Sequence, residues 1–139
     1  MPCIVVGYDD SPGSQAALEV AAALAAEHGD DLVIGFGIDP PGSGQVGEEH
    51  KAHRDALRDS GEQAAKRAVE AVRDKGVETR VELVDERPVD ALLALAEQHD
   101  ARFIVVGSYG ESPLKGAILG STPHKLLHLA ETPVVVVPA

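Results

Sequence analysis

The sequence predicts a doubly wound α/β fold in which five parallel strands take the order 3-2-1-4-5, with helices on both faces of the sheet. Short runs rich in valine and isoleucine alternate with longer helical segments through all 139 residues, which is the pattern of repeated βαβ units with right-handed crossovers. The runs at 3–7 and 103–107 are apolar and end in glycine, as expected of strands buried on both faces. Because 44% of the residues are apolar, we expect one core and a single domain over 1–139.

The first half of the chain contains two predicted strands and an Ala-rich helix. The strand at 3–7 leads through a turn-forming segment into a helix over 14–28, and Gly29 is placed to end this helix. A second strand follows at 32–38. The segment 39–47 contains two prolines and three glycines, so we expect a loop there.

The second half of the chain continues the alternation of helices and strands. In order, we expect a helix over 48–75, a strand over 77–84, a helix beginning at Pro88, a strand over 103–107, a helix over 122–130 and a strand over 134–137. The long helix is indicated by alanine and valine at helical spacing, and the strand after it by alternating apolar and polar residues. Pro88 suits a first helical turn, where a missing N–H costs nothing.

The two strands that are apolar throughout are placed side by side at the centre, which gives the strand order stated above. Ligands of such sheets bind outside the carboxyl ends of the strands, where the strand order reverses. In this chain the reversal lies between the strands at 3–7 and 103–107. The loops at 8–13 and 108–121 are therefore expected to meet in one site.

The second of these loops has the spacing of a phosphate site. Gly107 and Gly110 are separated by nine residues from Gly120 and Ser121, and the segment comes directly after a strand and before a helix. Glycines let backbone N–H groups approach an anion, and the helix N-terminus adds a partial positive charge. Ser121 can act as the N-cap or as a hydroxyl donor. The alternative is an ordinary strand-to-helix connection in which the glycines only make turns.

From Ile4 to Val137 the chain resembles the universal stress protein family. The most specific segments are 105–110 with 120–122, the valine run after Pro133, and the opening strand and loop at 4–11. The resemblance implies a flavodoxin-like fold, a homodimer and, in one branch of the family, ATP bound at the glycine loop.

The resemblance also implies a set of nucleotide-binding residues. These are Gly7, Tyr8, Asp9, Ile38, Gly107, Ser108, Gly110, Gly120, Ser121 and Thr122. Asp9 would meet the ribose hydroxyls, although it also suits a turn, and Ile38 would contact the adenine. The chain differs from the family pattern at Tyr109, Glu111 and Pro123, and Lys115 lies in the same loop as Glu111.

We therefore expect an ATP-binding universal stress protein that acts as a nucleotide-dependent sensor or regulator of a stress response. AMP and ADP are alternatives to ATP, and Mg²⁺ or Mn²⁺ is expected to accompany the nucleotide. Neither a G-x-S-x-G elbow nor a G-x4-G-K-[ST] loop occurs, so at most slow ATP hydrolysis is expected. The alternative function is that of a nucleotide-free, dimeric interaction or scaffold module.

Composition excludes several other classes of function. With 12 basic and 23 acidic residues, the net charge is −11, which opposes binding to nucleic acid. The longest apolar runs are too short to span a membrane. One cysteine, Cys3, and an N-terminus without signal-peptide features favour a cytoplasmic location.

Two further patterns are set aside. The segment 42–47 reads G-x-G-x-x-G, but it follows the second strand and two prolines, so a flexible loop explains its glycines better than a dinucleotide site does. The pairs His50 with His53 and His124 with His128 lack the other ligands of a metal centre. We interpret them as solvated helix residues.

The last strand is expected to form the dimer. In the predicted order the valines at 134–137 lie at an edge of the sheet, and no charged residue interrupts them. Such an edge pairs with another chain unless something covers it. A two-fold axis would pair the strand with its own copy and close the assembly, while Pro133 and Pro138 limit the pairing to the four valines.

Overall fold

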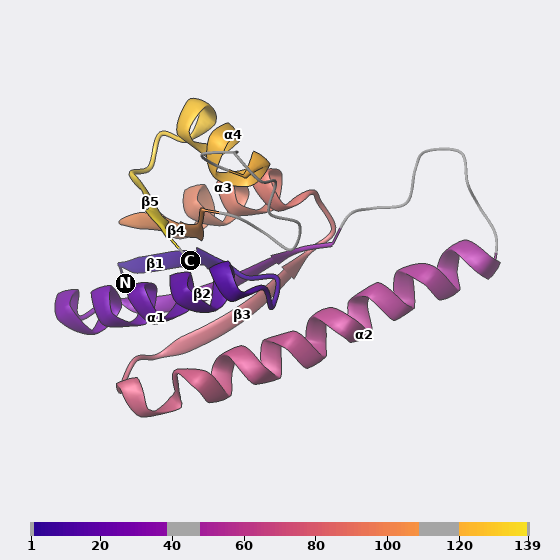
Figure 1. The fold of residues 1–139 in the computed structure, drawn as a ribbon, viewed down its shortest axis with the longest axis horizontal. Helices are drawn as coiled ribbons and strands as arrows, with labels where there is room; N and C mark the ends of the chain where they lie inside the picture. Colours follow the sequence, from indigo (N-terminus) through magenta and orange to yellow (C-terminus); the bar gives the residue numbers. More distant parts are fainter. Residues whose placement is uncertain (1, 39–47, 109–119, 139) are drawn as a thin grey trace.

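The computed structural model describes residues 2–38, 48–108 and 120–138 and contains one five-stranded parallel sheet (Figure 1). The strands are β1 (Cys3–Gly7), β2 (Asp31–Gly37), β3 (Thr79–Val84), β4 (Phe103–Gly107) and β5 (Val134–Val137). The helices are α1 (Pro12–His28), α2 (Glu48–Ala71), the 3-10 helix η1 (Arg73–Lys75), α3 (Pro88–His99) and α4 (Ser121–Leu129). The order β3-β2-β1-β4-β5 confirms the prediction.

β1 lies at the centre of the sheet, as its uninterrupted apolar sequence predicts. It pairs in parallel with β2 on one side and with β4 on the other, and Val6 lies in register with both Ile34 and Val105. The first four residues of β1 have no exposed surface. A strand that is buried on both faces can carry apolar side chains at every position, which explains the continuous run.

Two apolar layers cover the sheet. Alternate side chains point to opposite faces of a strand. Ile4 and Val6 of β1 therefore pack with Leu18 and the alanines of α1 and α2. The intervening Val5 packs with Leu92 of α3 and with α4. In Figure 1, α3 and α4 lie above the sheet, on the face opposite to that covered by α1 and α2.

The bounds of β1, β4 and β5 are those predicted, and several other element ends differ from the prediction by one or two residues. α1 begins at Pro12 and not at residue 14, because the hydroxyl of Ser11 accepts a hydrogen bond from the Ser14 N–H and the proline fits the first turn. The predicted helix over 48–75 divides into α2 and η1, and Gly76 ends it with φ 70°. β3 begins at Thr79 and not at residue 77.

α2 has two parts with different surroundings. Its second half contributes Ala64, Ala65 and Ala68 to the core, whereas residues 51–60 are all exposed. Figure 1 shows the first turns of α2 extending beyond the sheet. In this half of the helix, Nη2 of Arg58 forms an ion pair with Oδ1 of Asp85, which follows β3, at 2.9 Å.

Within residues 2–38, 48–108 and 120–138, no helix combines the length and the apolar character that a membrane span requires.

The first turn of α1 lies directly against the end of β4. A Cβ atom added to Gly107 would be 2.6 Å from both the carbonyl carbon and the carbonyl oxygen of Gly13. Real Cβ atoms do not come so close to another backbone, so this contact requires glycine at position 107. It fixes the start of α1 beside the carboxyl end of β4.

We expect Gly107→Ala to lower the free energy of unfolding by about 1–3 kcal/mol, because one of the two backbones must move to accept the methyl group. Gly61→Ala in α2 is the matched control. Its Cβ would meet only side-chain ends, that of Leu83 at 3.2 Å and that of Ile38 at 4.0 Å, and alanine gains about 1 kcal/mol of helix propensity. Urea unfolding measures both variants. Equal stability of Gly107→Ala and wild type would contradict the proposed backbone contact.

Candidate functional site

The carboxyl ends of β1 and β4 lie side by side where the strand order reverses. Of the two loops predicted to meet there, the described residues show the start of α1 against the end of β4. Gly107, the last residue of β4, lies against Gly13 at the start of α1, and Ser108 follows it. The N–H of Ser108 donates to the carbonyl of Val137 at 2.9 Å, and its own carbonyl accepts from the Gly120 N–H at 2.6 Å. Ser108, which is buried, thus joins the ends of β4 and β5 to the start of α4.

The N-terminus of α4 has two backbone N–H groups without an acceptor among the described residues. The first N–H groups of a helix have no intrahelical acceptor. Among those of α4, Gly120 donates to Ser108 and Pro123 has no N–H, so the amides of Ser121 and Thr122 are left without a partner among the described residues. Together with the two hydroxyls, these amides form a donor group suited to an anion.

The first of the two roles predicted for Ser121 is wrong. The N-cap of α4 is Gly120, which has extended backbone angles, φ −69° and ψ 172°, and Ser121 is the first helical residue. No side-chain hydrogen bond caps the helix, because the N-cap residue is a glycine and has no side chain. The Ser121 side chain is exposed and keeps the second predicted role, that of a hydroxyl donor.

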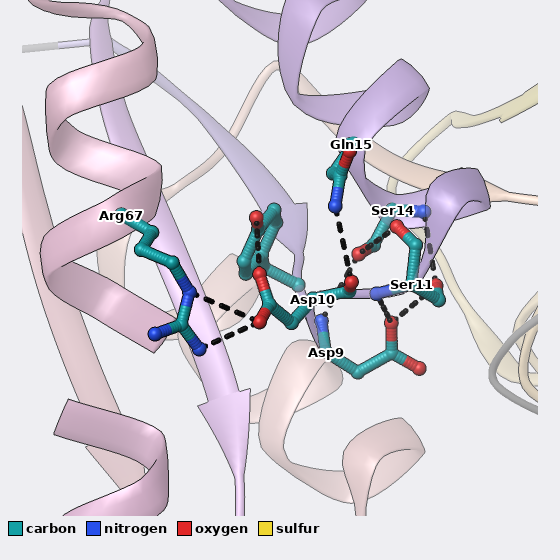
Figure 2. A network of polar contacts seen from close by, with 7 residues as sticks. Asp9, Asp10, Ser11, Ser14, Gln15 and Arg67 are labelled. Carbon is teal, nitrogen blue, oxygen red and sulfur yellow. Dashed lines mark hydrogen bonds and ion pairs between the residues drawn. The ribbon is translucent and has the colours of Figure 1, made fainter. Parts of the chain in front are cut away.

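Asp9 combines a turn with an available acceptor. One carboxylate oxygen, Oδ1, accepts hydrogen bonds from the backbone N–H of Ser11, at 3.0 Å, and from the Ser11 hydroxyl. The backbone N–H of Asp9 donates to the Ser14 hydroxyl at 3.2 Å. Figure 2 shows the second oxygen pointing away from this turn, and it has no hydrogen bond to any described residue. The turn role and the ribose role proposed for Asp9 are therefore compatible.

A second polar group beside Asp9 was not foreseen from the sequence. The buried Tyr8 packs its ring edge-on against Phe36, with ring centroids 5.7 Å apart, and its hydroxyl donates to Oδ1 of Asp10 at 2.9 Å. Arg67 of α2 donates to Oδ2 of Asp10 from Nε at 3.1 Å and from Nη2 at 2.6 Å (Figure 2). Since Asp10 and Arg67 are 57 residues apart, no local sequence pattern links them.

These contacts change the titration of both acidic groups. The hydrogen bond from Arg67 lowers the pKa of the Asp10 carboxyl below its ordinary value. Burial, followed by the hydrogen bond to Asp10, raises the pKa of Tyr8 to about 12. At neutral pH the three side chains are therefore a neutral phenol, a carboxylate and a guanidinium.

The other predicted site residues have varied surroundings. Gly7 faces α3, where an added Cβ would be 2.9 Å from a Leu92 methyl carbon. Ile38 is buried, and its N–H donates to the carbonyl of Val84 at 2.8 Å, which extends the pairing of β2 with β3 by one residue. Positions outside the described residues are Gly110, Tyr109, Glu111, Lys115 and the segment 42–47.

The described residues contain no group of three or more His, Cys, Asp or Glu side chains that could hold a metal ion. The rings of His124 and His128 lie 4.9 Å apart on α4. Amide and hydroxyl donors beside a carboxylate acceptor match a phosphate and a ribose diol.

The pKa of Tyr8 can be tested directly, since the chain has two tyrosines and Tyr109→Phe leaves one. We expect the absorbance of the tyrosinate to titrate with a midpoint at about pH 12, against about 10 for a free phenol. Because the folded-state pKa is raised, Tyr8 stabilises the fold fully below about pH 10, and this contribution is lost as the pH rises towards 12.

Asp10→Ala provides the comparison, because it removes the acceptor and the negative charge that oppose ionisation of Tyr8. Its midpoint should lie below that of the Tyr109→Phe background. Circular dichroism at each pH identifies the range in which the protein is folded. A midpoint near 10 in folded Tyr109→Phe protein would contradict the burial and hydrogen bonding of Tyr8.

Comparison with known proteins identifies the family. Residues 2–138 match the universal stress protein family. Universal stress protein YxiE of Bacillus subtilis is 32% identical, over 96% of this chain and 97% of its own. The structure of hypothetical protein MJ0577 has a TM-score of 0.88 at 22% identity, over 99% of this chain and 96% of that one, and so has the same fold. A universal stress protein in complex with cAMP has a TM-score of 0.74 at 29% identity, over 98% and 96% of the two chains. This chain therefore belongs to the universal stress protein family.

Proposed function

We propose that the chain binds ATP where β1 and β4 meet and acts as a nucleotide-dependent sensor or regulator in a stress response. The observation that carries this proposal is that hydrogen-bond donors and a carboxylate acceptor both lie at the carboxyl ends of β1 and β4. The amides of Ser121 and Thr122, which have no acceptor among the described residues, are assigned to phosphate. The second carboxylate oxygen of Asp9, which likewise has no donor among the described residues, is assigned to the ribose hydroxyls. The complex of a 29% identical relative with cAMP supports an adenine nucleotide as the ligand.

The proposed roles extend to the neighbouring residues. Phosphate and ribose contacts are assigned to Gly107, Ser108, Gly110, Gly120, Ser121 and Thr122, and the ribose hydroxyls also to Asp9. The adenine side of the ligand is assigned to Gly7, Tyr8 and Ile38. No general base is assigned among them, so hydrolysis is at most slow. AMP and ADP would make the same adenosine contacts as ATP. They carry fewer phosphates and would therefore make fewer contacts with the N-terminus of α4.

Electrostatics favours a metal-dependent interaction. The chain carries a net charge of −11, which opposes an anionic ligand. Arg67 already neutralises Asp10, but Asp9 keeps its charge next to the ligand. Mg²⁺ or Mn²⁺ on the phosphates would lower this repulsion.

We further propose that the protein works as a homodimer in the cytoplasm. β5 is an edge strand, and the only cysteine, Cys3, is buried and free, as suits a reducing compartment. The carbonyls of Pro133 and Val137 accept hydrogen bonds from β4. In a parallel ladder alternate residues bond to the same neighbour, so Val134 and Val136 direct their N–H and C=O groups to the free edge.

ATP binding is tested by calorimetry with Mg²⁺ or Mn²⁺ and by thermal unfolding. Nucleotide at 100 times its Kd should stabilise the fold by about 2.7 kcal/mol. Ser121→Ala should weaken binding by roughly 1.5–3 kcal/mol through loss of a hydrogen bond to a charged group. Ser60→Ala, at an exposed position of α2, is the control and should bind like wild type.

Absence of both binding heat and thermal shift at millimolar ATP with either metal would favour the nucleotide-free scaffold function. Unchanged affinity in Ser121→Ala would place the nucleotide elsewhere. Mass spectrometry of the nucleotide released from freshly purified, denatured protein distinguishes ATP from ADP and AMP.

The dimer is tested by light scattering after size exclusion, which should give twice the 14.5 kDa chain mass. Val136→Pro removes an N–H from the free edge in both copies and should weaken association by about tenfold or more. Val136→Ala loses similar packing but keeps the N–H, so it should remain dimeric. A wild-type monomer at tens of micromolar, or a dimeric Val136→Pro variant, would contradict pairing through β5.

A further inference from the structure

The loop between β1 and α1 contains a backbone conformation that needs support. Asp10 has φ 68°, in the left-handed region that residues other than glycine rarely adopt. Three contacts converge on it: the Tyr8 hydroxyl on Oδ1 at 2.9 Å, Arg67 on Oδ2, and the side-chain amide of Gln15 on the Asp10 carbonyl at 3.1 Å. The conformation is therefore held from the core, from α2 and from α1.

The two supports of the carboxylate have different origins. Tyr8 is 7% exposed, and its ring contacts Phe36 of β2, so the phenol is fixed by the core. Arg67 lies on the half of α2 that packs on the sheet, and two of its nitrogens donate to the same oxygen of Asp10. The side chain of Arg67 remains 57% exposed, which leaves the pair accessible to substitution without a cavity in the core.

The conformation of Asp10 sets the direction of Asp9. The φ torsion of Asp10 lies between Asp9 and Ser11, so a change of φ rotates Asp9 relative to the start of α1. The bonds from Ser11 to the Asp9 carboxylate depend on this relation. Figure 2 shows the side chain of Asp10 directed towards Arg67 and that of Asp9 directed to the opposite side, beside Ser11.

We propose that Tyr8, Asp10 and Arg67 form a latch that positions the Asp9 carboxylate for the ribose hydroxyls of the nucleotide. Arg67 is thus a positioning residue that acts through Asp9. The inference rests on the proposed function, since it assigns a specificity role within the same site. It also ties α2 to the ligand, because the guanidinium that holds the loop belongs to this helix.

The test compares ATP with 2′,3′-dideoxy-ATP, which lacks the ribose hydroxyls, by calorimetry with Mg²⁺. Arg67→Met removes the guanidinium and keeps an apolar stem of similar length. It should weaken ATP binding about fivefold, the upper range for an exposed ion pair, and leave dideoxy-ATP binding unchanged. Arg67→Lys should keep part of the wild-type preference for ATP over 2′,3′-dideoxy-ATP. Arg73, which pairs with Glu70 on exposed surface, provides the control Arg73→Met, and it should discriminate like wild type.

Two further variants separate the latch from a general effect on the fold. Asp10→Gly can adopt the positive φ, but it has no carboxylate through which Tyr8 and Arg67 could fix that conformation. It should therefore still lose the preference for ATP over 2′,3′-dideoxy-ATP. In an Asp9→Asn background, Arg67→Met should add no further loss, because the residue through which it acts is already changed. Circular dichroism and thermal unfolding confirm that each variant is folded.

The outcomes distinguish the inference from the function on which it rests. A wild-type protein that binds neither nucleotide overturns the proposed function and, with it, the latch. Wild-type binding of ATP with full discrimination retained in Arg67→Met or in Asp10→Gly overturns the latch alone. Equal wild-type affinity for the two nucleotides, or equal weakening of both by Arg67→Met, also overturns it.

Discussion

The parallel pairing of β1 with β4 is the constraint on which the functional part of this structure depends. The chain leaves β1 towards α1 on one face of the sheet, and it leaves β4 towards α4 on the other. Between two connections that diverge, the carboxyl ends of the strands stay uncovered by their own crossovers. The backbone contact of Gly107 with Gly13 then sets how closely the two helix starts approach. Donors and acceptors from distant segments thereby reach one site.

The order of the strands could be predicted because it depends on burial, which the sequence expresses directly. A strand such as β1, apolar at every position, has no suitable place except between two covered faces. The N-terminus of α4 could not be predicted in the same way. Its N-cap depends on a hydrogen bond from Gly120 to Ser108, and that bond exists only after β4 and α4 are brought together. Serine is a favoured capping residue. The sequence therefore suggests Ser121 as the N-cap, a position that Gly120 occupies in the structure.

The site shows the same division between local and tertiary information. Asp9 could be selected from its place after a buried strand, and the structure explains how it serves a turn and still offers an acceptor. Arg67 could not be selected, because it is one of several charged residues on a long polar helix and its partner is remote in sequence. Asp10 carried a partial signal, since aspartate tolerates a left-handed conformation better than most residues. The contact of Asp10 with Arg67 forms only because α2 packs on the sheet.

The division of α2 also bears on how the protein opens in its native state. Amides in the half that carries Ala64 and Ala68 lie over the core and exchange with solvent only when the sheet is uncovered. Amides at 51–60 lie in a segment whose side chains are all exposed, and surface ion pairs such as Arg58 with Asp85 add little stability. We therefore expect the two halves of this helix to unfold separately, so that unwinding from its exposed end stops before it reaches Arg67. Partial melting of this helix is thus separated from the segment that holds the β1–α1 loop.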